Sequence, residues 1–191
     1  DVTPPASAEH ISDNDYRAWH QDSMRVNDEL EYHPRPRLSV KVAFVLSDMS
    51  QPGRGNMLIC PGSHLKDTLD VPDGACDPAG AIPLCAEPGD TVIFDRRLWH
   101  SRSLNLSDIT RKIVFLGFAY RWLRPKDNLN LDALRGVANG VRAQLCGFDE
   151  DPNSYYDPGA GEVPLKEYLE ENGKSHTARD HHGGAMGMKP R

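Results

Sequence analysis

The chain has 191 residues, of which 38% are hydrophobic and 26% are charged, a composition typical of one globular domain with a proper core. Its net charge of −6 argues against a general binder of nucleic acid, because phosphate recognition needs a basic face. No apolar run is long enough to span a bilayer, so a membrane is not expected as a partner either.

Four cysteines, Cys60, Cys76, Cys85 and Cys146, are widely spaced and form no C-x-x-C motif. Separate thiols in a reducing compartment are therefore favoured over a disulfide framework or a zinc site. Since no signal peptide is visible, we expect a cytoplasmic protein. The chain begins with Asp1 rather than Met, and we expect it to be a fragment that lacks an N-terminal region.

The first third of the chain predicts few regular elements. Residues 1–15 contain Pro4-Pro5 and predict a loop or a truncated lead-in. A short strand is expected over residues 16–22. Two prolines exclude a central strand over residues 28–37.

From residue 38 to residue 122 the pattern is all-β, with short strands separated by Gly- and Pro-containing turns. Residues 65–80 predict a long surface loop, and a polar loop is expected over residues 101–110. This alternation of short strands and turns predicts a sandwich or a jelly roll. The predicted strands cover residues 38–47, 56–60, 82–85, 91–94 and 111–122.

The composition changes at Arg124-Pro125, after which helices are expected. Apolar spacing predicts a helix over residues 130–145, and a second one over residues 164–171 has Pro at its first turn. The expected division of the chain is a lead-in over residues 1–15, a β-rich catalytic core over 16–124, a helical segment over 125–172 and an extended or disordered tail over 173–191.

Three side chains have the character of metal ligands: His20 and Asp22 in the tripeptide H-Q-D, and His100 much later in the chain. Two imidazoles and one carboxylate, with open coordination positions, suit a non-haem Fe(II) oxygenase. On a strand, residues i and i+2 face the same side, so His20 and Asp22 could bind one ion together. The tripeptide alone is a weak signal because it often arises by chance.

Arg111 begins the longest apolar strand, eleven positions after His100. If the two strands around these residues form an antiparallel pair, Arg111 lies beside the base of the His100 strand and shares a face with Ile113 and Phe115. An inward guanidinium needs an anion, and a dicarboxylate co-substrate would suit its bidentate geometry. Pairing with an Asp or Glu of the protein is the alternative, and on these grounds alone the more common one.

Four stretches of the chain, which include His20, Asp22, His100 and Arg111, together resemble the phytanoyl-CoA dioxygenase family of Fe(II)- and 2-oxoglutarate-dependent oxygenases. The resemblance covers most of residues 19–122, and its most specific parts are the PGSH turn and the Arg that follows the distal His. The matching stretches are WHQD at 19–22, GNMLICPGSH at 55–64, GDTVIF at 89–94 and WHSRSLNLSDITR at 99–111.

The resemblance implies a mainly β protein, a double-stranded β-helix of the jelly-roll, cupin-like kind with C-terminal helices. It implies Fe(II) bound by the catalytic residues His20, Asp22 and His100, with 2-oxoglutarate as co-substrate and O2 as oxidant. It also implies that Arg111 binds the distal carboxylate of 2-oxoglutarate. The family often has a small hydroxyl residue two positions after the distal His. Arg102 stands there in this chain, and its neighbour Ser103 is the candidate for that co-substrate contact.

The implied reaction is hydroxylation of a small-molecule substrate, with decarboxylation of 2-oxoglutarate to succinate. Halogenating relatives lack the metal-binding carboxylate, so the presence of Asp22 favours hydroxylation. Two alternatives stay open: a non-catalytic cupin-like module that binds a metal or a small molecule, and a hydrolytic zinc enzyme. The triad in combination with Arg111 favours the oxygenase. Solvated surface is the favoured interpretation, and contact with an anionic substrate the alternative, for Arg96, Arg97, Arg102, Arg121 and Arg124. The sequence indicates neither the substrate nor the oligomeric state.

Overall fold

The computed structural model describes residues 1–7, 17–30, 35–120, 122–123, 130, 132, 140–147 and 163–172. The chain divides into two compact units, Asp1–Ala119 and Tyr120–Arg191. In the part of the chain that is described, no helix is long and apolar enough to cross a membrane. The predicted tail over residues 173–191 and half of the predicted helix over 130–145 lie outside the described residues.

The first unit contains an antiparallel sheet whose strands are long enough to bury one face. Its central pair is β2 (Ser39–Val45) and β7 (Arg111–Ala119). These strands are paired along their length, from Ser39 opposite Ala119 to Val45 opposite Ile113. On the other side of β2 lies β5, with Ala43 opposite Val92. In spatial order, the strands are β1 (Val2–Thr3), β7 (Arg111–Ala119), β2 (Ser39–Val45) and β5 (Thr91–Asp95).

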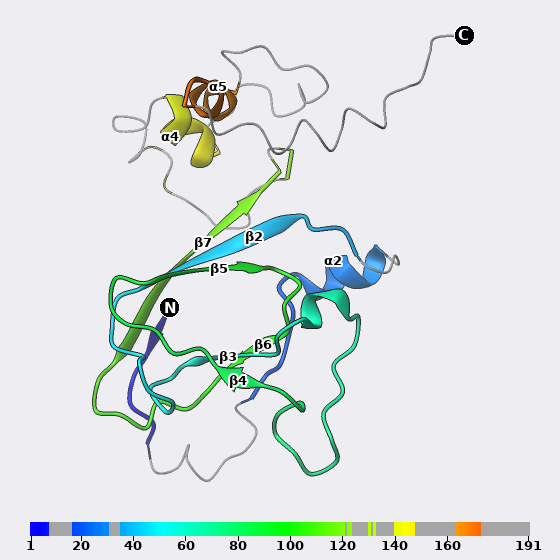
Figure 1. The fold of residues 1–191 in the computed structure, drawn as a ribbon, viewed down its shortest axis with the longest axis vertical. Coiled ribbons are helices and arrows are strands. Elements are labelled where there is room, and N and C mark those ends of the chain that lie inside the picture. Colours follow the sequence, from blue (N-terminus) through cyan, green and yellow to red (C-terminus); the bar gives the residue numbers. More distant parts are fainter. Residues whose placement is uncertain are drawn as a thin grey trace. The chain divides into compact units, whose positions relative to one another are not determined.

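A second antiparallel sheet lies opposite the first in the ribbon view (Figure 1). A 3-10 helix, η2 (Ser63–Leu65), follows β3 (Met57–Ile59) in the chain, and a short helix, α2 (Met24–Glu29), lies between β1 and β2. The strand order of this sheet is β4 (Ile82–Pro83), β3 (Met57–Ile59) and β6 (His100–Arg102).

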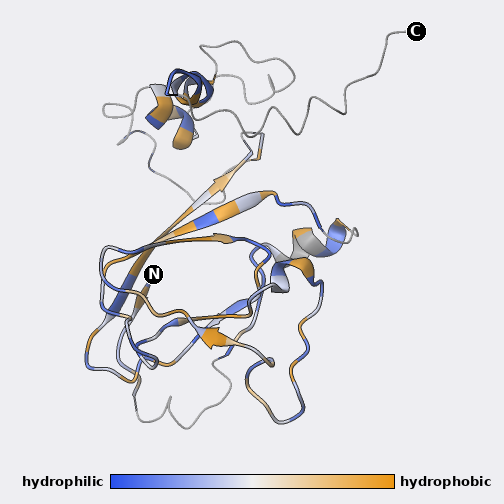
Figure 2. Ribbon diagram, in the orientation of Figure 1, coloured by the Kyte–Doolittle hydropathy of each residue, from blue (hydrophilic) through white to orange (hydrophobic). Residues whose placement is uncertain are grey.

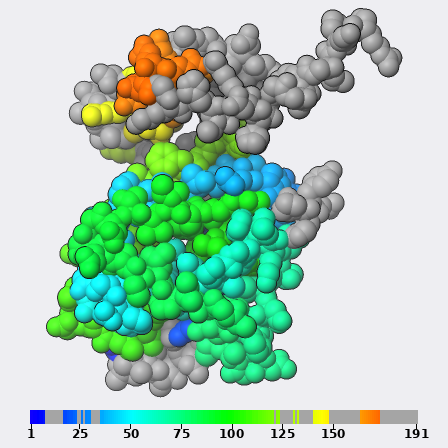
Figure 3. Space-filling model, viewed as in Figure 1, coloured from blue at the N-terminus to red at the C-terminus, as the bar shows by residue number. Residues whose placement is uncertain are grey.

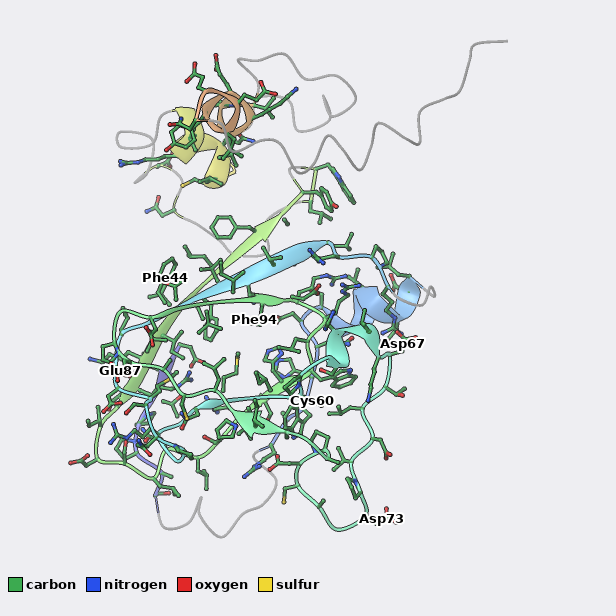
Figure 4. All side chains as sticks on the ribbon, viewed as in Figure 1. Phe44, Cys60, Asp67, Asp73, Glu87 and Phe94 are labelled. Atoms are coloured by element: carbon green, nitrogen blue, oxygen red, sulfur yellow. The ribbon has the colours of Figure 1, made fainter. Side chains whose placement is uncertain are left out.

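Alternation along the strands places the core between the two sheets. On β2, Ala43 and Val45 are buried while Phe44 is exposed, and Phe94 of β5 is buried (Figure 4). β4 and β5 are coloured as hydrophobic in Figure 2, and the space-filling view shows that side chains occupy the gap between the ribbons (Figure 3). Each fully buried aliphatic or aromatic side chain stabilises such a core by about 1.5–3 kcal/mol. The buried cluster consists of Ala43, Val45, Met49, Met57, Ala86, Phe94 and Ile113.

The predicted fold class, a mainly β double-stranded β-helix with C-terminal helices, is confirmed, and every predicted strand from residue 38 onward has a counterpart. Three local predictions are wrong. Val2–Thr3 forms a strand where a loop was expected, because it pairs with Lys112 and Arg111. His20 forms only an isolated bridge with His100, not a strand. Residues 101 and 102, the start of the predicted loop, belong to the strand β6.

The second unit contains two described helices, α4 (Gly140–Leu145) and α5 (Pro164–Glu171). The helix α5 has the predicted bounds, with Pro164 in its first turn. The backbone N–H of Leu165 donates to Oε1 of Gln144 at 2.8 Å, which ties the start of α5 to α4. The division of the whole chain at residues 15, 124 and 172 stays a prediction.

Candidate metal and co-substrate site

The three predicted ligands, His20, Asp22 and His100, converge. One ligand atom from each side chain lies within 4.8 Å of the other two. The backbones of His20 and His100 exchange two hydrogen bonds of 3.0 Å, and the N–H of Asp22 donates to the carbonyl of Arg96 at 2.9 Å. These backbone links bring residues from distant parts of the chain to one point. Among the described residues, this is the group of three whose spacing suits a metal ion.

Both imidazoles are oriented by the same kind of hydrogen bond. Nδ1 of His20 lies 2.8 Å from the carbonyl oxygen of Ala18, and Nδ1 of His100 lies 2.8 Å from that of Leu98. A carbonyl only accepts, so each Nδ1 carries the proton, and each Nε2 keeps its lone pair. Such backbone contacts fix the ring and tautomer of metal-binding histidines. The donor set therefore fits a divalent ion of the first transition series.

The environment keeps His100 neutral. Burial lowers the pKa of His100; the hydrogen bond to Leu98 opposes this, and the neighbouring His20 lowers the pKa further. The two ring centroids are 4.4 Å apart. A neutral imidazole is the form that coordinates a metal, so the lowered pKa of His100 favours its role as a ligand.

The PGSH turn holds the segment that carries His100. The backbone N–H of Trp99 donates to Oγ of Ser63 at 3.0 Å, and the N–H of Cys60 donates to the carbonyl of Trp99 at 3.1 Å. Ser63 is fully buried. The side chains of Gln21 and Trp99 both donate to the carbonyl of Lys66, just after this turn. One turn thus positions both ligand segments.

The three ligands open into a pocket of about 270 Å³ between the two sheets. The apolar side chains of Met57, Phe94 and Phe115 form part of its wall. The remaining lining residues are polar or charged, apart from Ala18: Asp1, His20, Asp22, Lys41, His100, Ser101, Arg102 and Arg111.

Arg111 lies in the same pocket as the three ligands, although its predicted strand pairing is wrong. β7 pairs with β1 and β2, while the His100 strand pairs with β3 in the other sheet. Arg111 is 2% exposed. Its Nη2 donates to Oδ2 of Asp1 at 2.8 Å and to Oγ1 of Thr3 at 2.7 Å, and Nε donates to Thr3 at 3.2 Å. The guanidinium is thus paired with a protein carboxylate, the alternative that the sequence left open.

The cationic form of Arg111 is less favoured than that of an exposed arginine. Burial lowers the pKa of Arg111 to about 10, and repulsion from Arg102 contributes to the shift. With a pKa of about 10 the group remains cationic at neutral pH.

Ser103 is not brought together with the other predicted site residues. It lines a second cavity, and its Oγ donates to the carbonyl of Leu104. Ser101 lines the pocket, and its buried Oγ has no hydrogen-bond partner among the described residues. Arg102 lines the pocket as well, and its side chain lies on the same side of β6 as that of His100.

The sequence analysis did not predict the position of Lys41 or the burial of two arginines. Lys41, in the middle of β2, places Nζ 3.4 Å from Oδ2 of Asp22; the alternation of β2 could have indicated that Lys41 faces inward. Arg96 and Arg97 are 2% and 6% exposed, so their interpretation as solvated surface is wrong. Arg97 forms hydrogen bonds with both carboxylate oxygens of Asp95, which compensate its buried charge.

A family model described as phytanoyl-CoA dioxygenase (PhyH) matches residues 6–113, more than half of the chain. The chain belongs to this family. It is 37% identical over 109 residues to "Dioxygenase af480" of Aspergillus fumigatus, which covers 56% of this chain and 34% of that protein. It is 32% identical over 84 residues to "Dioxygenase andF" of Emericella variicolor, covering 44% and 27%. The chain therefore spans about a third of the length of these relatives.

Similar solved structures include a nickel complex of the non-heme monooxygenase ThoJ, with a TM-score of 0.45 and 21% identity. That match covers 62% of this chain and 41% of the other. EctD from S. alaskensis with bound Fe has a TM-score of 0.43 and 18% identity, covering 62% and 42%.

Proposed function

We propose that this protein is a non-haem Fe(II)- and 2-oxoglutarate-dependent dioxygenase that hydroxylates a small molecule. The observation that carries the proposal is the convergence of His20, Asp22 and His100 in one pocket with the buried Arg111. Two imidazoles and a carboxylate leave coordination positions open, as a metal that binds both a 2-oxo acid and O2 requires. Membership of the phytanoyl-CoA dioxygenase family supports the same chemistry.

In this proposal the residues of the chain have separate tasks. His20, Asp22 and His100 hold the metal, and Arg111 binds the distal carboxylate of 2-oxoglutarate. The aromatic walls, Phe94 and Phe115, limit the access of water to the reacting atoms. With iron bound, the cofactor chemistry converts substrate C–H, O2 and 2-oxoglutarate into substrate C–OH, succinate and CO2. The protein positions the reactants and shields them from water.

The direct test is succinate release. Full-length protein with Fe(II), O2 and 2-oxoglutarate should form succinate, and a panel of small molecules should raise the rate when it contains the substrate. Asp22→Ala should abolish the stimulated rate while the protein stays folded. Absence of succinate with every compound, under conditions in which the metal is bound, would contradict the proposal.

A metal-binding module without turnover is the second candidate, favoured by one observation. The charge of Arg111 is already countered by Asp1 at 2.8 Å, so no co-substrate is needed to satisfy it. This candidate predicts that the protein binds a divalent metal but gains no further affinity for 2-oxoglutarate. Calorimetric titration of the metal-loaded protein with 2-oxoglutarate separates the two candidates.

A further inference from the structure

The proposed function assigns no task to Arg102, a cation that lines the pocket. Arg102 is two residues after His100 on β6, so the two side chains face the same side of the strand. Its register partner on β3 is Met57, which also lines the pocket. Arg102 and Arg111 therefore approach one cavity from different sheets.

The two guanidiniums differ in how their charges are balanced. Arg111 has the carboxylate of Asp1 and the hydroxyl of Thr3 as partners. The guanidinium of Arg102 forms no ion pair or hydrogen bond with any residue that the structure describes; Arg102 is exposed and lines the pocket. An entering carboxylate would meet an almost neutral pair at Arg111 but an unbalanced charge at Arg102.

We propose that Arg102 binds the distal carboxylate of the dicarboxylate co-substrate together with Arg111, and selects a dicarboxylate over a monocarboxylate 2-oxo acid. This inference rests on the proposed function. A carboxylate between two guanidiniums accepts charge-assisted hydrogen bonds from both, and it removes their mutual repulsion. The depressed pKa of Arg111, caused by burial and then by Arg102, is consistent with that repulsion.

The test compares two ligands that differ only at the distal end. 2-Oxoglutarate has a carboxylate there, and 2-oxopentanoate has a methyl group on a chain of the same length. Binding to full-length protein is measured by calorimetry with Mn(II) in place of iron, so that no turnover occurs. The variants are Arg102→Met, which keeps the apolar length, and Arg102→Lys, which keeps the charge.

Arg102→Met should weaken 2-oxoglutarate binding by about 10- to 100-fold, the range for hydrogen bonds to charged groups. Binding of 2-oxopentanoate should change by less than about threefold, since it has no group for a guanidinium to hold. Arg102→Lys should give an intermediate loss, because an ammonium supplies the charge without the forked geometry. Lys112→Met is the matched control: it removes one positive charge from the exposed side of β7 and should alter neither affinity.

Two results overturn the inference alone. Unchanged 2-oxoglutarate affinity in Arg102→Met would mean that Arg102 serves another ligand, such as an anionic substrate. An equal loss for both ligands would mean that the substitution damages the pocket in general. If the metal-loaded wild-type protein binds neither ligand, the proposed function fails as well, so the two failures are distinguishable.

Discussion

A Cβ atom built on Gly55 would lie 3.4 Å from Cδ of Arg111 and 3.2 Å from Cβ of Asn105. The glycine has a φ of +68°, in the left-handed region, and its N–H donates to the carbonyl of Leu104. The absence of a side chain at this position lets the buried guanidinium pass toward Thr3 and Asp1. The start of the G-N-M-L-I-C-P-G-S-H stretch thus belongs to the anion-binding end of the pocket.

Gly55→Ala should therefore impair both stability and co-substrate binding. The left-handed backbone costs about 1–2 kcal/mol with a Cβ present, and the close contacts displace Arg111. Urea unfolding and calorimetric titration with 2-oxoglutarate measure the two effects. Gly74→Ala is the control, with a φ of +75° and nothing within 4 Å of its Cβ. It should lose comparable stability and keep its affinity; equal affinity losses in both variants would contradict the role of Gly55.

Ser63→Ala should reduce metal affinity as well as stability. Ser63 accepts the backbone N–H of Trp99, and without that acceptor a buried donor next to His100 is left unpaired, at a cost of about 1–3 kcal/mol. Displacement of His100 should weaken Mn(II) binding, measured by calorimetry. The control is Ser47→Ala: Oγ of Ser47 accepts the backbone N–H of Lys112, and Ser47 does not line the pocket. Stability should fall in both variants but metal affinity only in Ser63→Ala.

Lys41→Met should strengthen metal binding. The ammonium of Lys41 competes for the carboxylate of Asp22 at 3.4 Å, and it repels a divalent cation bound by the same oxygen. A pair of this exposure contributes about 0.2–1 kcal/mol, so the dissociation constant for Mn(II) should fall by up to about fivefold. The free energy of unfolding should change little. Weaker Mn(II) binding in Lys41→Met would show instead that Lys41 supports the site.

Asp95→Asn should destabilise the fold in a pH-dependent manner. Burial would raise the pKa of Asp95, but hydrogen bonds from Arg97 and the charges of Arg97 and Arg37 hold it below its usual value. Because the folded-state pKa is lower than the unfolded one, the stabilisation is present above pH about 4 and is lost as pH falls through the folded-state pKa. The loss should be about 1–3 kcal/mol at pH 7.

Urea unfolding at pH 7 and near pH 3 checks this dependence. The difference between wild type and Asp95→Asn should shrink at the lower pH. Asp73→Asn makes the same change of charge in an exposed loop and should be nearly neutral at both values (Figure 4). A difference that does not depend on pH would contradict the electrostatic account.

Local patterns were enough to predict β2, β3, β4, β5 and β7, and to bring the three ligand residues into one hypothesis. The alternation in β7 predicted which of its residues face inward, and Arg111, Ile113 and Phe115 do so. Local patterns did not predict which strands pair with each other. The wrong pairing of the Arg111 strand arose because neighbours in sequence need not be neighbours in a sheet, and β7 pairs with β2, about 70 residues earlier.

The strand Val2–Thr3 and the buried arginines could not be predicted for a related reason. A two-residue strand followed by Pro4-Pro5 has no periodicity to detect, and only its pairing with β7 defines it. Arg97 is buried because Asp95, two residues earlier, supplies both carboxylate oxygens. An arginine with a carboxylate partner looks the same in sequence as one in solvent.

The most direct test of the central claim, that His20, Asp22 and His100 form one metal site that also receives 2-oxoglutarate, is the anaerobic visible spectrum of the full-length protein. Wild-type protein with Fe(II) and 2-oxoglutarate should develop a weak charge-transfer band that neither component gives alone. His100→Ala should lack the band while its far-ultraviolet circular dichroism stays unchanged. A band that persists in folded His100→Ala, or one that never forms in wild-type protein, would contradict the account.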